Sequence, residues 1–125
     1  MIQKYTQLKV ADNTGAKYIR VFHIMRGYKR RYARVGDIVT ASVKEAVPHS
    51  AVKKGDIVKA VIVRQRKEYN RVDGTYIRFD ENAVIVVEEK KGEILPKAGR
   101  IFGPIPREIA EAGHQAIVSL APEVI

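Results

Sequence analysis

Two clusters of lysine and arginine with interspersed tyrosines are the residues of this sequence best suited to chemistry. The first cluster, residues 26–34, holds five cations, two tyrosines and no acid. The second, residues 64–71, holds four cations, one tyrosine and one glutamate. Cations neutralise phosphates and tyrosine rings stack on bases. A single charged run is usually a solvated surface, but two clusters of this composition favour nucleic-acid binding, without distinguishing RNA from DNA.

The side chains that we expect to contact nucleic acid come mainly from these two clusters. A third, smaller patch precedes the strand that begins after Gly55, and one further arginine follows the second cluster. The predicted contact residues are Lys29, Arg30, Arg31, Tyr32, Arg34, Lys53, Lys54, Arg64, Arg66, Lys67, Arg71 and Arg78.

Residues that could catalyse a reaction or hold a metal are few. The sequence has no cysteine, which excludes disulfides, thiolate ligands and cysteine nucleophiles. His23, His49 and His114 stand at no metal-ligand spacing from one another or from a carboxylate, so we interpret each as structural. Asp37 and Asp56 could form a carboxylate pair, but both lie in the same Gly-Asp-Ile-Val sequence, which favours a turn. We therefore expect no enzymatic activity, no cofactor and no metal.

Charge is unevenly distributed along the 125 residues, which fit a single domain. The net charge is +9. Residues 1–80 have 18 Lys and Arg against 7 Asp and Glu, a net +11, whereas residues 81–125 have 5 against 7, a net −2. The basic part is expected to meet a polyanion. We recognise no signal peptide, and no stretch approaches the ~20 apolar residues of a membrane span, so no membrane partner is expected.

The apolar residues alternate with a period of two, which predicts β-strands. Many short strands with little helix indicate a mainly β protein, a small closed β-barrel. The expected strands are 7–12, 17–24, 36–46, 55–66, 75–80 and 82–89. The alternation places Ile19, Val21 and His23 on one face of the second expected strand. It places Val39, Ala41 and Val43 on one face of the third.

Turn signals separate these strands. Asp73–Gly74 is a strong hairpin signal and predicts a β-ribbon, around 64–78, that protrudes from the barrel. The sequence Gly-Asp-Ile-Val occurs at 36–39 and again at 55–58, which we interpret as repeated turn chemistry. Gly36 and Gly55 are expected to need backbone freedom that a Cβ would restrict.

The region after the barrel (residues 1–88) has a different character. Residues 89–125 are expected to form a Gly- and Pro-rich loop, one short helix that begins at Pro106 and ends before Gly113, and a docked apolar tail. We expect a protein-facing or bridging surface within 98–111. Its predicted contacts are Arg100, Ile101, Phe102, Pro104 and Arg107. The alternative is that Phe102 and the isoleucines close the end of the barrel.

Several motifs give the sequence a family resemblance over nearly its whole length. The segments ADNTGAK, RRYARVGDIV, DGTYIRFDENAVIV, GRIFGPIPREI and IVSLAPEVI follow one another in the order found in the ribosomal protein L-14 family of the large subunit, bacterial type. RIFGP and the SLAPEV ending are the most specific of them. Gly99 and Ala116 depart from the usual pattern, in which Thr and Lys are common.

This resemblance implies a five-stranded β-barrel with a protruding ribbon and short C-terminal helices. It also implies a non-enzymatic constituent of the cytoplasmic 50S subunit that binds 23S rRNA and helps form bridges to the small subunit and its 16S rRNA. The implied protein partners are ribosomal proteins L-3 and L-19, with a ribosome-silencing factor as a further candidate. The alternative reading is a free single-stranded nucleic-acid-binding barrel, which needs a groove with clustered aromatic side chains.

Overall fold

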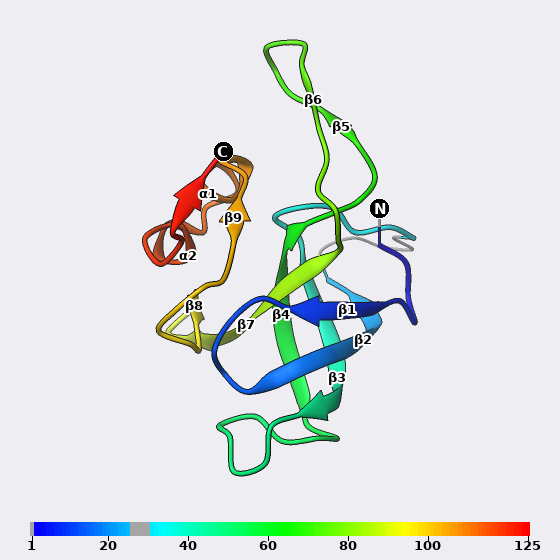
Figure 1. The fold of residues 1–125 in the computed structure, drawn as a ribbon, viewed down its shortest axis with the longest axis vertical. Helices are drawn as coiled ribbons and strands as arrows, with labels where there is room; N and C mark the ends of the chain where they lie inside the picture. The colour runs from blue at the N-terminus through cyan, green and yellow to red at the C-terminus, as the bar shows by residue number, and fades with distance from the viewer. Residues whose placement is uncertain (1, 26–30) are drawn as a thin grey trace.

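Five strands close into a barrel in the computed structural model, which describes residues 2–25 and 31–125 (Figure 1). The strands are β1 (Gln7–Val10), β2 (Ala16–Ile24), β3 (Ile38–Ala46), β4 (Ile57–Arg64) and β7 (Ala83–Lys90). Neighbours in this order pair antiparallel, and β1 pairs parallel with β7 through Lys9 opposite Ala83, which closes the barrel. The predicted five-stranded barrel is therefore confirmed.

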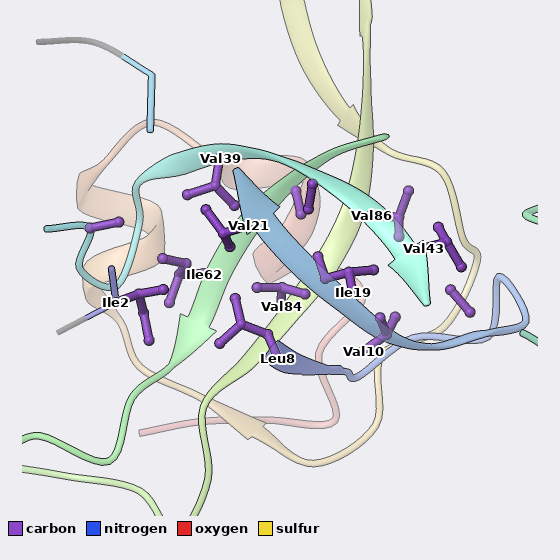
Figure 2. Close-up of a cluster of buried hydrophobic side chains, with 14 of the residues drawn as sticks. Ile2, Leu8, Val10, Ile19, Val21, Val39, Val43, Ile62, Val84 and Val86 are labelled. Carbon is purple, nitrogen blue, oxygen red and sulfur yellow. The ribbon is translucent and has the colours of Figure 1, made fainter. Parts of the chain in front are cut away.

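The barrel interior is filled by aliphatic side chains from the inner face of every strand. Figure 2 shows Leu8, Ile19, Val39, Ile62 and Val84 pointing towards one another inside the barrel, and all five are fully buried. Alternation along β3 is regular, so the predicted inner positions of that strand are confirmed. Burial of an aliphatic side chain of this size contributes about 1.5–3 kcal/mol, so this cluster is a main source of stability.

Strand β2 departs from the predicted alternation. Ile19 and Val21 are buried as expected, but His23 is exposed and Ile24 is buried instead. The pairing of β2 with β3 shifts register between Val21 and His23, and the extra residue of this bulge reverses the inward and outward sides beyond it. The expectation for His23 was wrong for this reason.

The outer side of β4 and β7 is covered by the C-terminal region. Ala60–Gln65 is buried throughout, as a strand covered on both faces requires. A second core forms there, where Val61, Val63 and Ile85 pack with isoleucines from the C-terminal region. The contributing isoleucines are Ile101, Ile105, Ile109 and Ile117, all nearly or fully buried.

The ribbon and the β7–β8 hairpin are the two extensions of the barrel. β5 (Tyr69–Asn70) and β6 (Tyr76–Ile77) pair across a turn in which Gly74 has φ +88°, as the sequence predicted. β8 (Glu93–Pro96) pairs antiparallel with β7 across Lys91–Gly92, two residues with positive φ. The expected loop at this position is thus a tight hairpin, in which the local turn chemistry outweighs the high Gly and Pro content.

The C-terminal region consists of α1 (Glu108–Glu111), α2 (Gln115–Val118) and a small parallel pair, β9 (Pro104–Ile105) with β10 (Glu123–Val124). The helix α1 is shorter than predicted. Its N-cap is Arg107, so the helix begins at Glu108 and not at Pro106. Gly113 has φ +95° just after its end, as expected. Ile109 packs on the barrel, whereas Ala112 is exposed. The tail is docked as predicted: the Ile125 amide donates to the Ile105 carbonyl at 2.9 Å.

Candidate nucleic-acid interface

Two identical turns present cations at opposite ends of β3 and β4. In the first, the Arg34 amide donates to the Asp37 carboxylate at 2.7 Å, and the Asp37 amide donates to the Arg34 carbonyl at 3.0 Å. Gly36 occupies the third position with φ +91°. In the second turn, Lys53–Asp56, the equivalent distances are 3.0 and 3.1 Å and the glycine φ is again +91°. The aspartates are therefore turn-stabilising, as predicted.

A buried glutamine joins the two basic clusters. Gln65 is only 1% exposed; its Oε1 accepts from the Val35 amide at 3.1 Å, and its Nε2 donates to the Lys67 carbonyl at 2.8 Å. Arg34, Lys67 and Tyr69 consequently line one groove of about 390 Å³. The sequence did not reveal this link, because an amide in a basic segment resembles one more solvated residue.

We call the exposed side chains of the two clusters, together with the nearby Arg78, the ribbon-side basic surface: Arg31, Tyr32, Arg34, Arg66, Lys67 and Arg78. Of these, Arg34 and Lys67 line the groove, which Glu68 and Glu108 also line. The loop that carries Arg31 is anchored through Ala33, which is fully buried and pairs with Ile2 through two backbone hydrogen bonds of 2.7 and 2.8 Å. Arg31, Arg34 and Arg66 form no ion pair with any residue in the described ranges. Their guanidinium groups are therefore available for an external anion.

Arg64 does not belong to this surface, contrary to the sequence prediction. It is 5% exposed, and its Nη1 donates to the carbonyls of Phe102 and Pro104, each at 3.0 Å. Its Nη2 pairs with Glu81 at 3.1 Å. Burial lowers the pKa of Arg64, and the charge of Glu81 opposes that shift. Because all these contacts are internal, Arg64 fastens the C-terminal region to the barrel.

Arg71 has a similar internal role. Its Nε lies 2.7 Å from the Glu108 carboxylate, and its Nη2 donates to the Ile125 carbonyl at 2.7 Å. These contacts fix the base of the ribbon against α1 and the chain terminus. Beside them, burial and the Glu108 charge raise the pKa of Tyr69 to about 12. Arg71, too, is already occupied by partners within the chain.

The remaining predicted contacts lie elsewhere. Lys29 and Arg30 fall outside the described residues. Lys53 and Lys54 are exposed on the β3–β4 loop, which Figure 1 shows at the end of the molecule opposite the ribbon. The structure therefore does not bring them to the ribbon-side basic surface.

The predicted C-terminal contacts divide into buried and exposed residues. Ile101 is 2% exposed and packs in the second core on the outer side of β4 and β7, so its side chain is not presented at the surface as the sequence predicted. Phe102 is 47% exposed, with the Arg100 guanidinium 5.7 Å from its ring centre. Arg107 is exposed and pairs with Asp73 of the ribbon turn at 3.5 Å, and Pro104 is half-buried.

Two further polar residues hold the loops in place. Asp12 accepts hydrogen bonds from the Thr14 amide and hydroxyl, and its second oxygen accepts from the Val86 amide at 2.8 Å. Burial raises the pKa of the Asp12 carboxyl, although these hydrogen bonds oppose the shift.

His114 is buried with Nε2 3.0 Å from the Gly36 carbonyl, so this nitrogen carries the proton. The structural role predicted for His114 is confirmed.

No group of three or more His, Asp or Glu in the described part of the chain is arranged to hold a metal ion. Within the same ranges, no helix has the length and apolar character needed to cross a membrane.

The fold and its exposed charge define a small, strongly basic, closed β-barrel protein with a cation-rich end. The family model of ribosomal protein L14p/L23e matches residues 1–125, and the chain belongs to this family. Members of the family are ribosomal proteins of the large subunit, and their role is generally structural and not enzymatic.

Proposed function

We propose that this protein binds large-subunit rRNA directly through the ribbon-side basic surface. The observation that carries the proposal is the joining of two separate basic clusters by the buried Gln65. The unpaired guanidinium groups of Arg31, Arg34 and Arg66 would neutralise phosphates. The Arg34–Asp37 turn fixes Arg34, and the backbone pairing of Ala33 with Ile2 anchors the chain beside Arg31, so RNA meets a preformed surface.

The tyrosine of this surface supports RNA as the partner. Tyr32 is exposed beside Arg31 on the loop anchored by Ala33. An aromatic ring among cations can stack on an unpaired base or a ribose, which is a common mode of RNA recognition. The family membership adds the ribosome as the setting.

Two other surfaces complete the proposal. Lys53 and Lys54 would form a separate, smaller rRNA contact at the opposite end of the barrel. Arg100, Phe102 and Arg107 are the exposed candidates for contacts with the 16S rRNA at bridges, or with neighbouring proteins such as L-3, L-19 or a silencing factor. In this proposal the protein holds rRNA segments and neighbouring subunits in position, in the cytoplasmic 50S subunit.

The test is a filter-binding titration of large-subunit rRNA at several salt concentrations with Arg31→Gln/Arg34→Gln. The slope of log K against log salt should become less steep by about 0.7–0.9 for each lost phosphate contact. The matched control is Lys91→Gln/Lys97→Gln, which removes the same charge from exposed positions around the β8 strand. The control should leave the slope nearly unchanged. Equal slopes for the parent and the arginine variant would refute the proposal.

A further inference from the structure

The outward face of β2 carries two aromatic rings with an arginine between them. Tyr18, Arg20 and Phe22 alternate with Ile19 and Val21, which point into the barrel in Figure 2. Register shifts beside Tyr18 and at Phe22 interrupt the regular strand at both ends of this segment, but all three side chains stay outside the barrel. Tyr18 is 38% and Phe22 39% exposed. Three flat groups therefore stand in a row on the barrel surface.

Two lysines stand at the Tyr18 end of this row, each in an exposed ion pair, Lys9 with Glu81 at 3.3 Å and Lys17 with Glu45 at 3.8 Å. Lys9 of β1 lies directly opposite Tyr18 in the strand register, and Lys17 is turned outward beside it by a register shift. At the same end, Tyr18, Lys9 and Lys17 line a groove of about 680 Å³ together with Phe102. Asp12 also lines this groove, but it is buried and its carboxylate accepts hydrogen bonds from within the fold.

We propose that this β2 face binds a single-stranded RNA segment, with bases stacked on Tyr18 and Phe22 and the Arg20 guanidinium between them. The proposal rests on rRNA binding as the protein's function, and adds a second contact formed mainly by stacking. Aromatic rings and guanidinium groups are the platforms on which unpaired bases stack. The groove beside Tyr18 offers space for a further nucleotide.

Charge favours RNA over a protein partner here. Tyr, Phe and Arg are frequent in protein interfaces as well, but Lys is depleted there, whereas Lys9 and Lys17 flank this row with exposed side chains. Glu45 lies opposite Tyr18 in the register, and its carboxylate is 3.8 Å from the Lys17 ammonium group. The face therefore presents rings and cations to a partner, the combination that a nucleic-acid strand requires.

The experiment uses Tyr18→Leu and Phe22→Leu, which keep an apolar side chain and the net charge but remove the ring. Each should weaken binding of a single-stranded RNA of about 12 nucleotides by roughly 5- to 100-fold, without changing the salt slope, because stacking releases no counterions. Tyr18→Phe should retain parental affinity. In parallel, RNA carrying 4-thiouridine should cross-link to Tyr18 or Phe22 of the unaltered protein, a readout that does not depend on how a variant folds.

The possible results separate this inference from the proposed function. Unchanged affinity in both leucine variants, or cross-links that avoid Tyr18 and Phe22, would overturn the inference and leave this face to a protein partner. If Arg31→Gln/Arg34→Gln still flattens the salt slope in that case, the proposed function stands alone. Loss of affinity with an unchanged slope supports the stacking surface.

Discussion

Replacement of Arg64 by methionine should destabilise the fold and leave RNA contacts intact. Arg64 makes two hydrogen bonds of 3.0 Å to carbonyls and one ion pair of 3.1 Å while almost fully buried. A hydrogen bond to a charged group contributes about 1.5–3 kcal/mol, and three that share one guanidinium are not additive. Methionine keeps the aliphatic packing, and the Glu81 side chain is 39% exposed, so its carboxylate can return to water. We therefore expect a loss of about 2–4 kcal/mol in the free energy of unfolding.

Urea unfolding followed by circular dichroism measures this loss. Arg66→Met is the matched control, two residues along the chain, with an exposed side chain that forms no ion pair within the described residues. Its unfolding free energy should stay within about 0.5 kcal/mol of the parent. RNA titrations should give the reverse pattern, with a shallower salt slope for Arg66→Met and a parental slope for Arg64→Met.

Two results would refute this reasoning. If Arg64→Met unfolds at the parental urea concentration, the contacts with Phe102 and Pro104 contribute nothing to stability. If instead its salt slope falls as much as that of Arg66→Met, Arg64 contacts phosphates in the complex, and its internal role is wrong.

Two further predictions concern residues in turns. Gly36→Ala should cost more stability than Gly55→Ala in thermal melts: both have φ +91°, which costs about 1–2 kcal/mol for alanine, but only at Gly36 would the new Cβ lie 3.0 Å from the Ala112 Cβ. Equal melting temperatures for the two variants would contradict this. Because burial raises the folded-state pKa of Asp12, the protonated carboxyl favours folding below its ordinary value of 3.8, and this advantage is lost as the pH rises through the raised pKa. In urea unfolding from pH 3 to 7, the free energy of unfolding of the parent should fall relative to that of Asp12→Asn between pH 3.8 and the raised pKa, and should stay level above the raised pKa. A constant difference would show that Asp12 does not titrate as described.

The strand pattern could be predicted wherever the pairing is regular. In β3 a simple alternation placed Val39 and Val43 correctly, because no bulge interrupts its inner face. In β2 the same rule failed at His23, since a bulge depends on the register with the partner strand and leaves no reliable mark in the local sequence.

The cations show a second limit of sequence reasoning. Arg64 and Arg66 are indistinguishable by composition, yet one is buried against Phe102 and the other is exposed. One signal was available: a strand covered on both faces buries every polar side chain it carries, and Arg64 ends such a strand. Which carbonyls it would reach depends on a segment almost 40 residues away, which no local pattern specifies.

A cryo-electron microscopy structure of the large ribosomal subunit that contains this protein tests the central claim most directly. The account predicts Arg31, Arg34 and Arg66 at rRNA phosphates, with nitrogen–oxygen distances of about 2.7–2.9 Å. It also predicts that Arg64 keeps its contacts with the Phe102 and Pro104 carbonyls. A subunit in which the ribbon-side basic surface faces solvent or another protein, with no phosphate within reach of these three arginines, would contradict it.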